Sequence, residues 1–195
     1  MDMLFLKHSP SLCDFQNYVH ALEIERGFAH ENLAQKCLLL GEEIGELCEA
    51  IRQYASQSVN SVAGELADVL IILFSMANRL ETTDAYTTLQ KHFLSFIHKK
   101  NTSLSFSQMQ QIIPSTSHTT EVLCLQLVEK NGLLFKCIRK LERIKLDASS
   151  KTMNTDQKLA EVLLTLCQIA NRFQLNLETL FREKEAINKT RKWQV

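Results

Sequence analysis

The chain repeats a pair of helical segments within itself, and this repeat limits the possible folds more than any other feature. Residues 64–80 align with residues 157–173 at eight identical positions of seventeen, including a shared Ala-Asn-Arg. Upstream, residues 37–53 align with residues 124–140 and share a Cys, a Gly and an Arg in register. Amphipathic helices often look alike, but these in-register residues favour a duplication.

Apolar residues at spacings of three and four predict helices along the whole chain. Five Gly and two Pro are too few for the many turns of a sandwich or barrel. Ser11 and Asp14 form a predicted capping box for a first helix that stops at Gly27. Further helices are predicted over about residues 31–54, 62–80, 81–100, 119–145, 156–173 and 176–192. The predicted fold class is therefore all-α.

The predicted domain organisation is two tandem units joined by a linker. Residues 1–100 form the first unit, and residues 119–195 form a degenerate copy of it. Residues 101–118 are rich in Ser and Thr and contain Pro114, which is typical of a connecting segment.

The charge balance argues against large polyanionic partners. Lys+Arg and Asp+Glu each total 22, so no net positive field attracts nucleic acid or an anionic membrane. No segment approaches the roughly 20 apolar residues of a membrane span, and the N-terminal apolar run is too short for a signal peptide. Six cysteines without a CxxC pair fit buried reduced thiols. We expect a cytoplasmic protein, with export without a classical signal left open.

Two short acidic sequences, EEIGE and ELAD, interrupt these helices. Their carboxylates are Glu42, Glu43, Glu46, Glu65 and Asp68. Positions three or four apart share a helix face, so Glu43 lies beside Glu46 and Glu65 lies beside Asp68. Carboxylates that gather near an apolar core repel one another, and an unpaired buried charge is costly.

A divalent cation would offset this repulsion. The basic side chains considered as countercharges are Arg52 and Arg79, and oxygen-only ligands favour Mg²⁺ or Mn²⁺. The alternative is a solvated acidic face. It stays open for Glu42 and Glu49, whereas the apolar neighbours of the ELAD sequence argue against it there.

The second copy lacks this acid cluster. Glu43, Glu46, Glu65 and Asp68 correspond to Lys130, Leu133, Lys158 and Glu161. Glu42 is kept as Glu129, so the second copy keeps the apolar pattern but not the carboxylate cluster, and the fold does not need that cluster. The acids therefore point to a function.

The two acidic sequences resemble the EExxE…ExxD signature of the all-α NTP pyrophosphatases, which include MazG-like proteins, small dCTP pyrophosphatases, dimeric dUTPases and phosphoribosyl-ATP pyrophosphatase. The resemblance covers about residues 15–100 and, more weakly, residues 119–193. It implies a helical bundle of MazG-like type whose two tandem repeats pack as a pseudo-dimer, or a homodimer. It also implies hydrolysis of a nucleoside or deoxynucleoside triphosphate at the α–β bond.

The resemblance assigns roles residue by residue. Glu43, Glu46, Glu65 and Asp68 would be ligands of Mg²⁺, with Mn²⁺ as an alternative. Glu42 and Glu43 would be catalytic, with Glu42 orienting a water or a second ion.

The family also tends to carry a basic K…N..R element, which Lys184, Asn188 and Arg191 match in the second copy. A composite site follows, with metal ligands from the first half and phosphate contacts from the second. Lys91 is the alternative phosphate contact. Family members often place base contacts before the EExxE helix, here at Phe28, His30 and Asn32. A non-catalytic nucleotide- or partner-binding module is the alternative function.

Overall fold

A computed structural model describes residues 3–54, 58–80, 104–114, 116–145 and 154–193. All regular secondary structure in these residues is helical, which confirms the all-α prediction. The helices are α1 (Met3–Leu6), α2 (Leu12–Arg26), η1 (Phe28–His30), α3 (Leu33–Gln53), α4 (Val59–Arg79), α6 (Phe106–Gln111), α7 (Thr120–Leu141), α8 (Thr155–Arg172) and α9 (Leu177–Asn188). The helix predicted over residues 81–100 lies outside the described residues.

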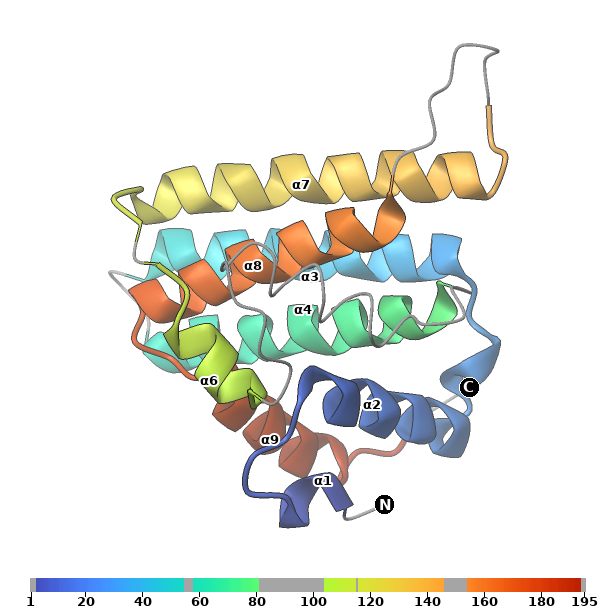
Figure 1. Ribbon diagram of the computed structural model, residues 1–195, viewed down its shortest axis with the longest axis horizontal. Helices are drawn as coiled ribbons and strands as arrows, with labels where there is room; N and C mark the ends of the chain where they lie inside the picture. Colours follow the sequence, from blue (N-terminus) through green and yellow to red (C-terminus); the bar gives the residue numbers. More distant parts are fainter. Residues whose placement is uncertain (1–2, 55–57, 81–103, 115, 146–153, 194–195) are drawn as a thin grey trace.

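Two antiparallel helix pairs form the body of the bundle. α3 pairs with α4, α7 pairs with α8, and the pairs meet through α3 with α7 and through α4 with α8 (Figure 1). α2 and α9 lie against α4 on the side away from α7. Each predicted copy thus supplies one helix pair, although the duplication itself stays a prediction.

The boundaries of the first long helices follow from local capping. The Ser11 side chain accepts a hydrogen bond from the Asp14 N–H, and the Asp14 side chain accepts one from the Ser11 N–H. Gly27 ends α2 with a φ of 83°, a left-handed conformation that favours glycine. Asn32 begins α3 through a second capping box with Gln35. The predicted capping box and glycine stop of α2 are therefore confirmed.

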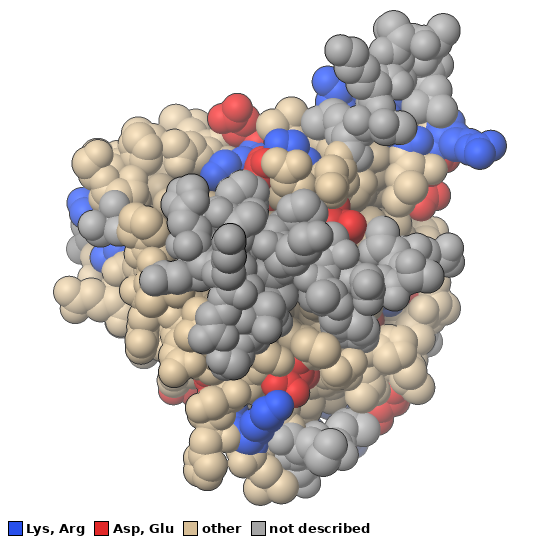
Figure 2. Space-filling model, in the orientation of Figure 1, with Lys and Arg blue, Asp and Glu red and all other residues tan. Residues whose placement is uncertain are grey.

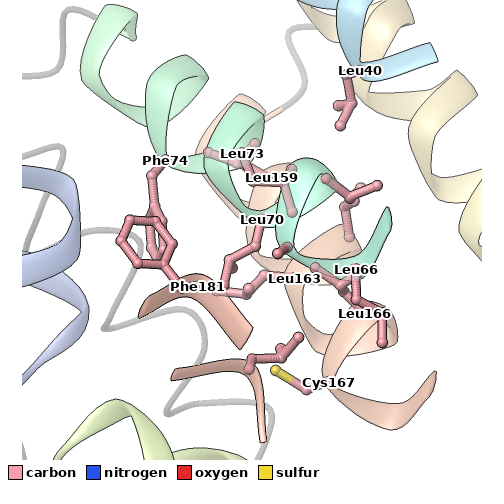
Figure 3. Packing of buried hydrophobic residues seen from close by; sticks show 14 of the residues in the cluster. Leu40, Leu66, Leu70, Leu73, Phe74, Leu159, Leu163, Leu166, Cys167 and Phe181 are labelled. Carbon is pink, nitrogen blue, oxygen red and sulfur yellow. The ribbon is translucent and has the colours of Figure 1, made fainter. Parts of the chain in front are cut away.

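α4 lies at the centre of the hydrophobic core. Figure 3 shows its buried side chains facing those of α8 and α9; the labelled residues of this contact are Leu66, Leu70, Leu73, Phe74, Leu159, Leu163, Leu166, Cys167 and Phe181. Phe15 of α2 stacks on Phe74 at 5.7 Å and meets the edges of Phe106 and Phe181 at 5.5 and 4.9 Å between ring centroids. These rings join α2, α4, α6 and α9 into one core.

The apolar composition of α4 is also typical of a membrane-spanning helix. Among the described helices, Val59–Arg79 is long and apolar enough to cross a membrane by length and composition alone, contrary to the expectation that no segment approaches a span. In the bundle, however, this helix contacts α2, α3, α8 and α9. Its central place in the core accounts for its composition.

Part of the predicted linker is a packed helix. Phe106 and Met109 of α6 lie three residues apart and are fully buried. Gln110 of α6 donates to the Leu175 carbonyl at 2.7 Å and to Asn171 Oδ1 at 2.9 Å. Within the predicted linker, residues 106–111 thus form a helix that packs on the core through two buried side chains at helical spacing.

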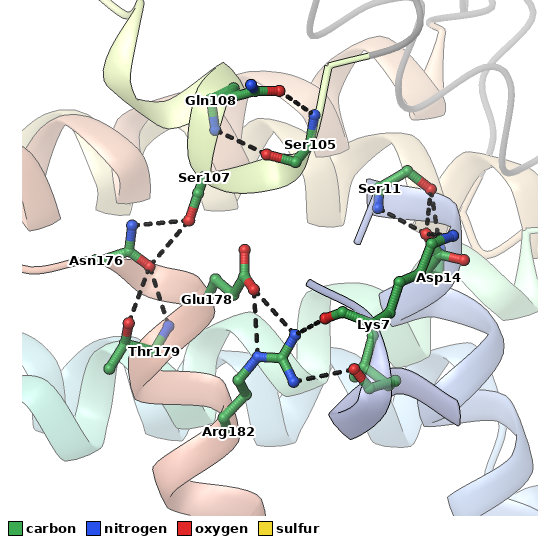
Figure 4. Close-up of polar contacts among 11 residues, drawn as sticks. Lys7, Ser11, Asp14, Ser105, Ser107, Gln108, Asn176, Glu178, Thr179 and Arg182 are labelled. Carbon is green, nitrogen blue, oxygen red and sulfur yellow. Dashed lines mark hydrogen bonds and ion pairs between the residues drawn. The ribbon is translucent and has the colours of Figure 1, made fainter. Parts of the chain in front are cut away.

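Polar contacts hold α9 in place from two sides (Figure 4). On one side, Asn176 exchanges hydrogen bonds with Ser107 of α6. On the other, Arg182 donates to the carbonyls of Leu4 and Lys7 at 2.9 and 2.8 Å. These contacts fix the helix that carries Lys184.

The described surface carries both signs of charge. On the face in Figure 2, Lys and Arg side chains lie close to Asp and Glu side chains. The charge balance of the sequence therefore extends to the described part of this face.

Candidate active site

A cavity of about 590 Å³ lies between α2, α3, α4 and α9. Glu43 and Glu46 line it from α3, and Glu65 and Asp68 line it from α4. The antiparallel pairing of α3 with α4 brings the two acidic sequences together. Lys184 reaches the same cavity from α9.

Three of the four predicted metal ligands converge. Ligand oxygens of Glu43, Glu46 and Glu65 all lie within 4.8 Å of one another. Carboxylate oxygens at this spacing fit a hard divalent cation such as Mg²⁺ or Mn²⁺. Asp68 lines the same cavity but forms an ion pair with Lys184. The donor set therefore suits a cation held by three carboxylates, with Asp68 at its edge.

The electrostatics of the cluster are unfavourable without a cation. Burial, reinforced by the charges of Asp68, Glu46 and Glu65, raises the pKa of Glu43 to about 7, while Lys184 opposes the shift. Burial also raises the pKa of Glu65 and of Asp68 above their ordinary values. Ionised carboxylates are thus disfavoured here, and a bound cation would stabilise them.

Lys184 of α9 supplies a positive charge beside the acid cluster, whereas Arg52 of α3 and Arg79 of α4 were the candidates in the sequence. Arg52 instead pairs with Glu49 on the surface at 3.6 Å. Arg79 pairs with Glu23 at 2.7 Å. The two candidate countercharges of α3 and α4 thus pair outside the acid cluster, and Lys184 reaches the cluster from α9.

The predicted phosphate contacts from the second half reach the cavity. Lys184, Asn188 and Arg191 all line it. α9 ends at Asn188, so Arg191 lies in the segment that follows the helix and not on its face. Lys91 lies outside the described residues.

The predicted base contacts separate into two groups. Phe28 lines the cavity and meets the edge of Trp193 at 5.4 Å. His30 is exposed and hydrogen bonds to the Gly27 carbonyl, and Asn32 caps α3. Neither His30 nor Asn32 is among the residues that line the cavity.

Glu42 is exposed and does not line the cavity. The different exposure of Glu42 and Glu43 follows from helix geometry, because consecutive residues are rotated by about 100° around the axis at 3.6 residues per turn. Glu43 therefore faces the cavity while Glu42 faces solvent. The predicted role of Glu42 in orienting a water has no support from this placement.

A buried ionic network beside the cavity was not predicted. Glu23 of α2 accepts hydrogen bonds from Arg79 and Ser75 and pairs with Lys36 at 3.0 Å. Although burial alone raises the pKa of Glu23, these partners lower it below its ordinary value. Arg79 also donates to the Phe28 carbonyl at 2.9 Å. The network joins α2, α3, α4 and η1 at one wall of the cavity.

In the second helix pair, lysines stand at two of the positions that match the acids of the cavity, and each lysine has a polar partner. Lys158 forms an ion pair with Glu161 at 2.7 Å, and Lys130 donates to Thr165 Oγ1 at 2.7 Å. Burial lowers the pKa of Lys130. Within the described residues, the only group of three metal-ligating side chains at suitable spacing is the one in the first pair.

Comparison with known proteins agrees with the geometry of the first pair. The family model of the MazG nucleotide pyrophosphohydrolase domain matches residues 28–103, which include all four acids of the cavity. No curated protein and no solved structure matches the chain. Lys184, Asn188 and Arg191 lie outside the matched segment. The first helix pair with its four acids therefore lies in a segment that the MazG nucleotide pyrophosphohydrolase family model matches.

Proposed function

We propose that the protein hydrolyses a nucleoside or deoxynucleoside triphosphate at the α–β phosphate bond and releases a nucleoside monophosphate and pyrophosphate. The observation that carries this proposal is the convergence of Glu43, Glu46 and Glu65 within 4.8 Å in a cavity that Lys184 also lines. The family of residues 28–103 supports the reaction class.

Mg²⁺ or Mn²⁺ would be held by the carboxylates of Glu43, Glu46 and Glu65, which offer the oxygen ligands that these ions prefer. When bound, the ion neutralises charge on the phosphates and lowers the pKa of a coordinated water. The three carboxylates must be ionised to hold it. Burial, with the charges of Asp68, Glu46 and Glu65, raises the pKa of Glu43, and a bound cation would favour its ionised form.

The phosphate groups would lie between the acids and α9. Lys184, beside Asp68, offers an ammonium group that binds a phosphate oxygen as a point charge. Burial raises the pKa of Asp68, and the charges of Lys184 and Arg191 oppose this shift, which places Arg191 near that carboxyl. The two cations come from the second half of the chain, so the proposed site is composite.

The reaction needs few other groups. The oxygen of a water bonds to the α-phosphorus, the bond to the bridging oxygen breaks, and pyrophosphate leaves. Positioning and charge stabilisation supply most of the catalysis in such phosphoryl chemistry. The cavity residues named above supply both.

The test is incubation of the purified protein with each common NTP and dNTP, in Mg²⁺ or Mn²⁺, with quantification of pyrophosphate and monophosphate. We expect equimolar amounts of the two products, and their loss in Glu43→Gln. Glu49→Gln, an exposed neighbour on α3, is the matched control and should keep full activity. Failure of every nucleotide to yield pyrophosphate, with a folded protein, would refute the proposal.

A nucleotide-binding module without catalysis is the second candidate. The Lys158–Glu161 ion pair favours it, because it stands at the positions that match Glu65 and Asp68 and replaces two carboxylates with a lysine and a glutamate. A nucleotide that raises the melting temperature without being hydrolysed would select this alternative.

We also propose that the two helix pairs of one chain take the place of two subunits, in a cytoplasmic protein. The arrangement of α3 and α4 against α7 and α8 supports this pseudo-dimer. Light scattering during size-exclusion chromatography separates a monomer from the alternative homodimer.

A further inference from the structure

Two cysteines from different helix pairs meet where the pairs pack together. Cys48 of α3 and Cys124 of α7 are free and partly exposed, and their side chains hydrogen bond to each other. Neither is among the residues that line the cavity of the candidate active site. The chemistry proposed for that cavity therefore leaves this thiol pair without a role.

The packing of α3 on α7 accounts for the meeting of the two thiols. The helices contact each other and run antiparallel (Figure 1). A Cβ atom at Gly41 of α3 would lie 3.7 Å from the ring of Phe135 of α7, so these two positions face each other.

The spacing along each helix returns the cysteines to this contact face. Cys48 comes seven residues after Gly41, and at about 100° per residue it lies within about 20° of the same face of α3. Cys124 comes eleven residues before Phe135 and lies within about 20° of the same face of α7. Because the helices are antiparallel, both steps lead toward the same end of the bundle.

The other cysteines are placed differently. Cys137 and Cys167 are buried. Cys13 lies on α2 and accepts a hydrogen bond from Asn17 at 3.4 Å. Cys37 shares α3 with Cys48 but lies about 16 Å from it along the helix, at 1.5 Å per residue. Cys37 is therefore a matched reference for the reactivity of Cys48.

We propose that Cys48 and Cys124 form a reversible disulfide when the protein meets hydrogen peroxide, and that this bond ties the two helix pairs together. The inference does not depend on the proposed function. It rests on two thiols of different helices that already touch and that a small oxidant can reach. Where thiols are kept reduced, disulfides of this kind are usually transient and redox-sensing.

The reaction has two steps. One of the two sulfurs, as its thiolate, attacks an oxygen of the peroxide; the O–O bond breaks, and a sulfenic acid and hydroxide form. The second sulfur attacks the sulfenic sulfur, so that the S–S bond forms and the S–O bond breaks. Each hydroxide leaves as water with one thiol proton. The two sulfurs together lose two electrons, which reduce one peroxide to two waters.

The bond would change the stability of the bundle. It would link α3, whose Glu43 and Glu46 line the cavity, to α7 of the other helix pair. It would also close the chain between residues 48 and 124 into a loop, which restricts the unfolded chain. Oxidation should therefore raise Tm by about 5–10 °C, and dithiothreitol should reverse the rise.

The test is peptide mapping after one equivalent of hydrogen peroxide is added to the reduced protein and the remaining thiols are blocked with N-ethylmaleimide. Trypsin without reductant should release residues 37–52 joined to residues 101–130. Cys48→Ala and Cys124→Ala should lose both the joined peptide and the rise in Tm. Cys37→Ala should keep both, which excludes Cys37 as the linked residue of the first peptide.

Three results would overturn the inference. The first is a peroxide-treated wild type without the joined peptide, and the second is a joined peptide that persists in Cys48→Ala or Cys124→Ala. The third is a bond between two chains, seen as joined peptides of mixed isotope content when labelled and unlabelled proteins are combined before oxidation. If an alanine variant does not fold, the wild-type map with fragmentation of the joined peptide decides the question.

Discussion

Lys184 of α9 forms an ion pair with Asp68 of α4, although 116 residues separate them in the sequence. The side chains keep only 16% and 21% of their surface exposed. The pair joins the half of the chain that carries the acids to the half that carries the proposed phosphate contacts. The proposed composite site depends on this contact.

Lys184→Met should destabilise the metal-free protein by about 1–3 kcal/mol, between the values for surface and buried pairs, because Asp68 loses its partner. Urea unfolding in EDTA measures this. If Lys184 also binds phosphate, kcat/KM for the best nucleotide should fall at least tenfold. Lys192→Met, an exposed cation nearby, is the control. Unchanged stability and turnover in Lys184→Met would contradict the assignment.

Glu43 makes the stability of the metal-free protein depend on pH. The folded pKa of about 7 lies above the unfolded value near 4.5, so the folded chain keeps a proton that the unfolded chain has lost. The free energy of unfolding should therefore fall as pH rises from about 4.5 to 7, and then level off. Denaturant unfolding of the wild type and of Glu43→Gln in EDTA, at pH 5 to 8, measures the effect. A Glu43→Gln profile parallel to the wild type would contradict it.

Divalent metal should bind at one locus only. Mn²⁺ or Mg²⁺ must displace the proton of Glu43, so affinity should rise with pH up to about 7. Glu65→Gln should lose this binding, and Glu49→Gln should keep it. A Mn²⁺ titration followed by electron paramagnetic resonance counts the loci. Mn²⁺ binding that survives unchanged in Glu65→Gln would contradict the assignment of the metal to this cluster.

Arg79→Met should cost about 3–5 kcal/mol of stability at pH 7, because it removes a partner of the buried Glu23. The lowered pKa of Glu23 stabilises the protein above the unfolded pKa, and this contribution is lost as pH falls through the folded value. The cost should therefore shrink in acid. Thermal unfolding at pH 7 and pH 4 measures it. Arg52→Met is the control, because the Arg52 side chain is 73% exposed, and it should change stability by less than about 0.5 kcal/mol. An equal loss of stability in both variants would contradict the role of the network.

Residues close in sequence account for most of what was predictable. The Ser11–Asp14 box and the Gly27 stop are local rules, and they hold. The convergence of Glu43 and Glu65 needed only two helices joined by a short turn, whose pairing is forced to be antiparallel. The geometry of the candidate metal site was therefore within reach of the sequence.

The ionic network around Glu23 could not be predicted from the sequence. Its members stand on three helices with no shared spacing, and their pairing depends on how α2 lies against α3 and α4. α6 had one local signal, the Ser105–Gln108 capping box, but six residues give too short a pattern to reveal periodicity. Long-range placement, and not local preference, decided both features.

The distance in sequence between Asp68 and Lys184 also orders events during synthesis. At about 5–20 residues per second, Lys184 is translated roughly 6–23 s after Asp68. A nascent chain in that interval exposes its carboxylates without their lysine, and dissolved cations must screen them. Residues 184–193 are thus the last part of the cavity wall to be translated, and the wall is complete only after translation has passed them.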